Sequence, residues 1–131
     1  MKIDEVKEWI RHAEDDLFSA KLLFDNVRKP LEIICYHCAQ SAEKYLKAFL
    51  VYNCIAPQKT HDLLLLLSYC SKIDDSFLTM NTECGFLNAF NNEIRYPNII
   101  EIEDVDAKLA ISYVEKIIKI IAIENMLKTI K

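Results

Sequence analysis

Apolar residues return every three or four positions through most of the chain, which is the spacing of one side of an α-helix. The first such stretch predicts a helix from about Asp4 to Asp25, with Asp4 as its N-cap. The apolar side of this helix is formed by Val6, Ile10, Ala13, Leu17, Ala20 and Phe24. Residues 26–29 then form a turn.

A second helix is expected from Pro30, which suits the first position of a helix, to about Asn53. Its apolar side consists of Ile34, Cys38, Ala42, Tyr45 and Phe49. Its opposite side is polar and consists of Gln40, Glu43, Lys44 and Lys47. Glu43 precedes Lys47 by four residues, the favourable orientation for an ion pair on a helix surface. A polar side of this kind is usually solvated, and that is the simpler interpretation.

The middle of the chain predicts two further helices. Thr60 caps the first, which reaches about Cys70 and has Asp62 in its first turn, where the helix dipole favours a negative charge. The second opens at residue 74 or 75 and ends near Arg95, because the proline two residues later cannot continue a helix.

A last helix is expected from Asp104, as its N-cap, nearly to Lys131. Its apolar side spans roughly 200°, whereas a helix on the outside of a bundle needs only about 100°. Either this helix is central in the fold, or the additional apolar surface packs against another subunit. We favour the second interpretation, a homodimer with Ile111 and Ile118 among its contacts.

The composition favours a few long helices over a sheet. The 131 residues contain one glycine and three prolines, whereas sheets need turn residues at short intervals. The length suits a single domain over residues 1–131, and no repeat or linker divides the chain. The sequence therefore predicts one all-α domain.

The net charge and the cysteines limit which binding partners and which cellular compartment are expected. A net charge of −4 gives no overall attraction to nucleic acid or to an acidic membrane, so RNA binding would need a local basic patch. The first nine residues are charged and carry no apolar signal region, so we expect no secretion signal, and the apolar runs are too short to span a membrane. Five cysteines without a secretion signal indicate reduced thiols in the cytoplasm. Cys35 and Cys38 fall within one helix, where core packing is a better explanation than a zinc or redox site.

Four segments, in this order and at this spacing, resemble the HEPN family of prokaryotic helical bundles. They are Trp9-x-x-x-Ala13-x-x-Asp16-Leu17-x-x-Ala20, Cys38-Ala39-Gln40-Ser41-Ala42-Glu43-Lys44-x-x-Lys47-Ala48, Thr60-His61-Asp62-Leu63 and Arg95-Tyr96-Pro97-Asn98. The resemblance implies an up-and-down four-helix bundle with a short extra helix, usually paired as a dimer. It also implies a neighbouring small nucleotidyltransferase, as in a toxin–antitoxin pair. Many members are metal-independent ribonucleases with an arginine followed, four to six residues later, by a histidine.

The sequence departs from this ribonuclease pattern. The histidine is expected four to six residues after the arginine at position 95. The residues there, however the spacing is counted, are Ile99, Ile100, Glu101 and Ile102. Cleavage of RNA without a metal needs a base for the 2′-hydroxyl proton and a cation for the phosphate. Arginine can serve as the cation, but isoleucine cannot serve as the base. The sequence therefore leans against an enzyme.

Arg95 and His61 are the leading candidates for a ligand-binding site. Arg95, at the end of a helix, either caps exposed carbonyls or contacts a phosphate through its planar guanidinium. His61 follows the expected capping threonine, where the dipole disfavours a positive imidazole and suits a hydrogen-bonding group beside an anion. Its alternative is a solvated residue or one bonded to Asp62. Tyr96 is a further candidate in a rebuilt ribonuclease site.

The polar side of the second helix completes the candidate site with Gln40, Lys44 and Lys47, for which a solvated surface is the alternative. No metal or other cofactor is expected. The leading hypothesis is a non-catalytic module that dimerises, docks on a nucleotidyltransferase-type partner and binds a nucleotide or RNA. The alternatives are a ribonuclease toxin with a degenerate motif and a purely structural oligomerisation domain.

Overall fold

The computed structural model describes residues 2–91 and 101–131, and every regular element in these two ranges is helical. In chain order the elements are α1 (Ile3–Phe24), α2 (Leu31–Tyr52), α3 (Leu63–Ile73), the 3-10 helix η1 (Asp75–Met80), α4 (Asn81–Asn88), α5 (Asp104–Ile118) and α6 (Ile121–Ile130). The predicted all-α fold is confirmed. Within the described ranges, no helix combines the length and the apolar character needed to cross a bilayer.

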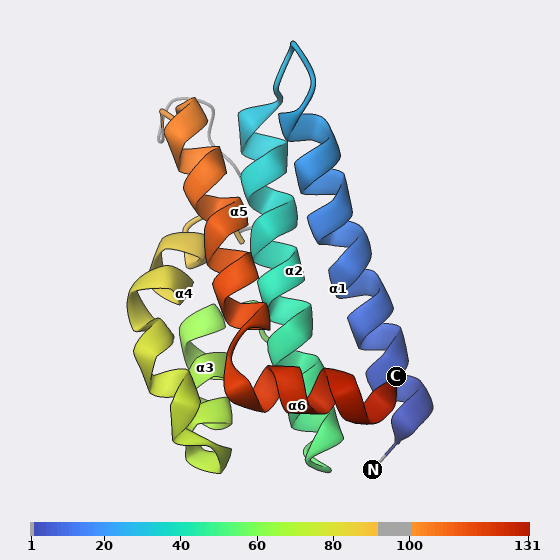
Figure 1. The fold of residues 1–131 in the computed structure, drawn as a ribbon. Coiled ribbons are helices and arrows are strands. Elements are labelled where there is room, and N and C mark those ends of the chain that lie inside the picture. Colours follow the sequence, from blue (N-terminus) through green and yellow to red (C-terminus); the bar gives the residue numbers. More distant parts are fainter. Residues whose placement is uncertain (1, 92–100) are drawn as a thin grey trace.

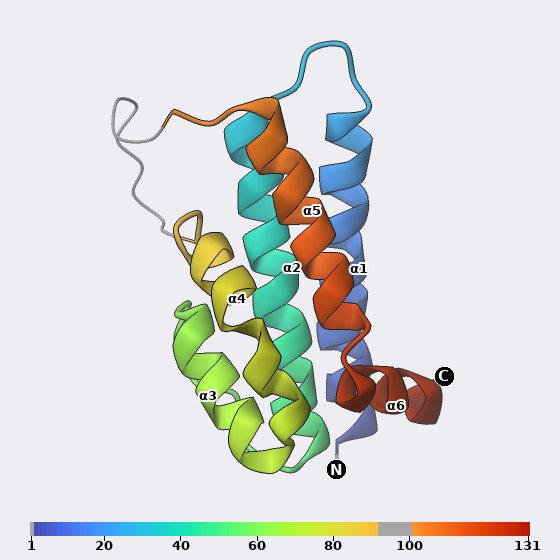
Figure 2. The same cartoon turned by 60° about the vertical axis from the view of Figure 1, so that its left-hand side comes forward.

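The helices form a bundle built around an antiparallel hairpin of α1 and α2 (Figure 1). α5 runs along this hairpin, while α3 and α4 lie together on the side of α2 that faces away from α1 (Figure 2). α6 crosses the end of the bundle at which α1 begins (Figures 1 and 2). α2 contacts α1, α3, α4, α5 and α6, so it is the central helix.

The central position of α2 decides what its polar side does. Ile34, Leu46 and Leu50 are fully buried on its apolar sides, as a core helix requires. Glu43 and Lys47, however, are only 3% and 5% exposed, so the prediction of a solvated polar side is wrong for these two residues. Neighbouring segments cover this part of α2, and the two charges are removed from water together.

The N-caps of α1 and α3 differ from those predicted. α1 begins at Ile3, which places Asp4 in its first turn, where a carboxylate still interacts favourably with the helix dipole. α3 is capped by Asp62, whose carboxylate accepts the backbone N–H groups of Leu64 and Leu65 at 3.0 and 3.3 Å. Thr60 instead accepts the N–H of Asp62 at 3.1 Å. The helix therefore starts two residues later than expected, because a carboxylate was available there as a cap.

The region predicted as one helix from residue 74 or 75 to Arg95 is divided. Asp74 accepts the N–H of Ser76 at 2.9 Å and caps the short 3-10 helix η1, which leads into α4. α4 ends at Asn88, and the described part of this region ends at Asn91. Arg95 and Tyr96 lie outside the described residues.

The expected last helix is two helices. Glu103, not Asp104, is the N-cap of α5, and it forms a reciprocal capping box with Asp106. The helix stops at Ile118, and Ile120 is extended before α6 begins. The direction change buries further apolar residues against the end of the bundle, namely Ile120, Ala122, Ile123, Met126 and Ile130. This break accounts for much of the surplus apolar side. Ile111 and Ile118 are half-buried and already pack against the core.

The cysteines are free thiols, and four of the five are buried in the core. Cys35 and Cys38 are both fully buried, so the prediction that this pair serves core packing is confirmed. Burial raises the pKa of the Cys84 thiol to about 12 and also raises the pKa of Cys38. Cys54, in the loop after α2, is the exposed cysteine.

Candidate functional site

A buried carboxylate on α2 is the centre of the candidate site. Glu43 accepts hydrogen bonds from Lys47 Nζ at 2.9 Å, from His61 Nδ1 at 2.9 Å and from Asn91 Nδ2 at 2.7 Å. These partners come from α2 itself, from the segment before α3 and from the segment after α4. Glu43 therefore joins three parts of the chain at one point.

Asn91 links Glu43 to two further groups, the backbone of His61 and the side chain of Gln40. Its Nδ2 also donates to the backbone carbonyl of His61 at 2.6 Å, and its Oδ1 accepts from Gln40 Nε2. Asn91 is itself buried. We call Gln40, Glu43, Lys47, His61 and Asn91 the Glu43 network.

The hydrogen bonds decide the charge state of Glu43. Burial alone would raise the pKa of this carboxyl group, but the donors Lys47, Asn91 and His61 outweigh burial and hold the pKa below its ordinary value. The group is therefore an ionised carboxylate at neutral pH. An ionised carboxylate can only accept, so His61 Nδ1 carries the hydrogen in this contact.

Lys47 is held inside the fold and does not point into solvent. Its ammonium group lies 2.9 Å from Glu43 and 5.6 Å from the centre of the Trp9 ring on α1. An ammonium close to an indole ring gains a cation–π interaction in addition to the ion pair. Lys47 thus connects α2 to α1, and its charge is already balanced by Glu43.

Lys44, predicted for the same site, belongs to a different cluster. It pairs with Asp16 of α1 at 2.5 Å, and His37 Nδ1 lies 2.9 Å from the other oxygen of that carboxylate. These three side chains are partly buried between α1 and α2. The two predicted lysines are therefore each paired with a carboxylate, so they do not supply an unpaired basic patch.

His61 stands at the edge of the Glu43 network, with 55% of its side chain exposed. It precedes α3 and is not in the first turn as predicted. Asn88 of α4 fixes this segment, because it accepts the N–H of Leu63 at 2.9 Å and donates to Asp62 at 3.0 Å. The position of His61 is thus set by contacts on both sides of it.

The sequence identified part of this network and missed the rest. Gln40, Lys47 and His61 were predicted, and the structure brings these three together. Glu43 was predicted only to pair with Lys47 on a helix surface, although a polar stripe in a helix with this many apolar residues was a signal for burial. Asn91 had no local signal, because its partners are up to 51 residues away in the chain.

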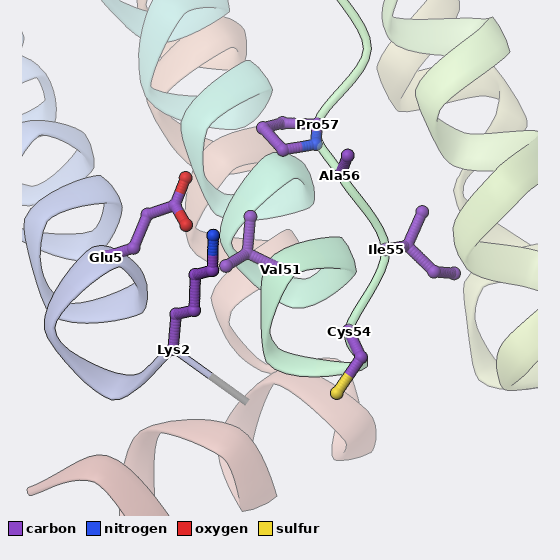
Figure 3. A pocket seen from close by; sticks show the side chains of 7 residues that line it. All are labelled: Lys2, Glu5, Val51, Cys54, Ile55, Ala56 and Pro57. Carbon is purple, nitrogen blue, oxygen red and sulfur yellow. The ribbon is translucent and has the colours of Figure 1, made fainter.

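A separate hollow of about 300 Å³ lies where α1 begins and α2 ends (Figure 3). Val51 and Ile55 form part of its apolar wall, while Lys2 and Glu5 lie on the side of α1 and Cys54 at one edge (Figure 3). None of the predicted site residues that the structure describes lines this hollow. It is therefore distinct from the Glu43 network.

Comparisons with known proteins agree on the type of fold. A family model described as the HEPN domain matches residues 6–126. Among solved structures, the chain is similar to a crystal structure of an archaeal HEPN homologue, with a TM-score of 0.68 and 22% identity. That alignment covers 96% of this chain and 98% of the other. No curated protein sequence matches the chain.

Proposed function

The chain belongs to the HEPN domain family, and from this premise we propose that it is a non-catalytic binding module. In this proposal it dimerises, docks on a nucleotidyltransferase-type protein and holds a phosphate-bearing ligand, a nucleotide or RNA, at the Glu43 network. The candidate ligand contacts are His61, Gln40 and Arg95. Tyr96 is a further candidate. Lys44 and Lys47 contribute indirectly, through the ion pairs with Asp16 and Glu43 that keep α2 in position.

The observation that carries the proposal is the burial of the Glu43–Lys47 ion pair. Removing two charges from water costs free energy that their mutual attraction only partly returns, so such a pair is a poor device for stability. Buried, hydrogen-bonded charges gather instead at functional sites, where they hold neighbouring groups in fixed positions. Here they hold Asn91 and the exposed imidazole of His61. The network therefore supports a preformed binding site.

The same burial favours binding over cleavage. A cation that assists phosphate chemistry must reach the phosphate, and Lys47 is enclosed between Glu43 and Trp9. The residues after Arg95 also lack the histidine of the ribonuclease pattern. What remains accessible at the described site is His61 with the half-buried amide of Gln40. These groups suit hydrogen bonding to a phosphate or a base.

A titration of a nucleotide and of a short single-stranded RNA tests the proposal. His61→Ala should weaken binding about tenfold, the effect of losing one hydrogen bond to a charged group. His37→Ala is the matched control, because His37 also contacts a carboxylate at 2.9 Å but lies outside the Glu43 network. Arg95→Ala should remove most of the binding, and Arg95→Lys should restore part of it. Equal affinities in all four variants and the wild type would place the site elsewhere.

One observation favours the ribonuclease alternative. The ionised Glu43 at 2.9 Å from His61 Nδ1 has the arrangement by which a carboxylate orients an imidazole as a general base. The RNA in the titration should therefore be checked on a gel in the presence of a chelator. Cleavage that is lost in both His61→Ala and Arg95→Ala, but kept in His37→Ala, would establish the enzyme and contradict the non-catalytic proposal.

The partners are proposed from family membership. Sedimentation of the wild-type protein at micromolar concentration tests the dimer, and a monomer would contradict it. Ile111 lines a hollow of about 350 Å³ between α1 and α5, and in this proposal a second copy packs over that surface. Co-purification with the product of an adjacent nucleotidyltransferase reading frame tests the second partner. A dimer with neither a partner nor a ligand would instead support a purely structural oligomerisation domain.

A further inference from the structure

The hydrogen bonds of the Glu43 network fix the orientation of the Asn91 amide. Asn91 Nδ2 donates to Glu43 Oε1 at 2.7 Å and to the backbone carbonyl of His61 at 2.6 Å. A backbone carbonyl and an ionised carboxylate can only accept, so the amino end of Asn91 must face both of them. The Oδ1 of Asn91 is therefore turned toward its third partner, Gln40.

The orientation of Asn91 fixes that of Gln40 in turn. Asn91 Oδ1 accepts a hydrogen bond from Gln40 Nε2. Turning the Gln40 amide over would place its Oε1 against Asn91 Oδ1, and two acceptors at hydrogen-bonding distance repel each other. Gln40 Oε1 is therefore held on the side of the amide that faces away from Asn91.

Gln40 Oε1 is an acceptor that a ligand can reach. Gln40 is half-buried, and no donor in the described part of the chain bonds to its Oε1. Among the described residues, the buried side-chain oxygens and nitrogens without a partner belong to Ser76 and Glu83, so Gln40 Oε1 is in contact with solvent. The network thus presents one lone-pair oxygen to solvent in a fixed orientation.

This polarity decides which part of a nucleotide fits beside Gln40. Phosphate oxygens are acceptors, so they gain nothing from Gln40 Oε1, whereas the edges of the bases carry N–H donors. Tyr36 lies four residues before Gln40, one turn away on the same side of α2, and it is partly exposed. Bases stack on aromatic rings of this kind. A hydrogen-bond acceptor next to an aromatic ring suits a base better than a phosphate.

We propose, on the basis of the function proposed above, that Gln40 is a specificity-determining residue of the site. Its Oε1 accepts a hydrogen bond from an N–H group of the base, and the base stacks on Tyr36. The phosphate of the same ligand lies away from Gln40. The site therefore recognises the base of a nucleotide and not its phosphate alone.

The probes are AMP and purine riboside 5′-monophosphate, which lacks the amino group of adenine, each titrated into the whole chain by calorimetry. The wild type should bind AMP about tenfold more tightly, because the analogue covers Gln40 Oε1 without supplying a donor. Gln40→Ala should weaken AMP binding by about the same factor and abolish the difference between the two nucleotides. Tyr36→Leu should weaken both and keep their ratio, because stacking does not need the amino group.

Asn53→Ala is the matched control, because Asn53 also donates from its amide, to the carbonyl of Phe49 at 2.8 Å, but lies at the C-terminal end of α2. It should leave both affinities unchanged. Equal affinities of the wild type for AMP and the analogue, or a ratio that persists in Gln40→Ala, would overturn the role of Gln40 and leave the proposed binding site standing. The comparison in the wild type needs no variant, so it is decisive even if Gln40→Ala does not fold.

The failure of the proposed function has a different signature. If AMP does not bind to the wild type at all, the role of Gln40 is overturned. If the short single-stranded RNA also fails to bind, the proposed function is overturned with it.

Discussion

Replacing Glu43 with glutamine should lower the free energy of unfolding by about 3–5 kcal/mol, the usual result of leaving a buried charge without its partner. Glutamine has nearly the same shape, so the loss comes from charge and not from a cavity. Lys47 would keep its buried ammonium without the one carboxylate that pairs with it among the described residues, and His61 and Asn91 would lose an ionised acceptor. The double variant Glu43→Gln, Lys47→Met should recover about half of the loss or more, because it removes both charges.

The same substitution should change the response to acid. Folding holds the pKa of Glu43 below its ordinary value of 4.5, so near that pH the folded protein binds fewer protons than the unfolded chain. The resulting stability is present above pH 4.5 and is lost as the pH falls through the folded-state pKa. The wild type should therefore lose more stability on acidification than Glu43→Gln does.

Urea unfolding followed by far-UV circular dichroism, at pH 7 and at several lower values, measures both effects. Glu115→Gln is the matched control, because Glu115 and Lys21 are also 2.9 Å apart but have 45% and 48% of their side chains exposed. An exposed pair contributes about 0–1 kcal/mol. Equal losses in Glu43→Gln and Glu115→Gln, or a double variant no more stable than Glu43→Gln alone, would refute the reasoning from burial.

Three further predictions concern the fold. In the native protein, a thiol reagent should label Cys54 alone, with the four buried thiols reacting only after denaturation, as mass spectrometry would show. Met126→Ala should cost about 2–5 kcal/mol in urea unfolding because Met126 is fully buried in α6, whereas Ile121→Ala, at an exposed position, should cost under about 0.5 kcal/mol. Asp62→Ala should lower the free energy of unfolding by about 1 kcal/mol, because α3 loses its cap, and Thr60→Ala should lower it by less. A larger loss in Thr60→Ala would show that the threonine is the cap.

The sequence by itself determined the helical class, the two long helices α1 and α2 to within a few residues, and the family. These features depend on local information. A spacing of three or four between apolar residues and a shortage of glycine act within one segment of the chain. The motif Gln40-x-x-Glu43-x-x-x-Lys47 was likewise visible because its members share one helix.

Only the tertiary structure decided what these polar residues do. Whether Glu43 and Lys47 are solvated depends on what covers α2, and the covering residues come from other parts of the chain. Asn91 donates to a carboxylate 48 residues before it, a contact that no local pattern encodes. The break at residues 119–120 has the same origin. No glycine or proline marks it, and the chain turns there because α6 buries its apolar side against the end of the bundle. Local periodicity specifies that a segment is helical, but burial and pairing are properties of the assembled fold.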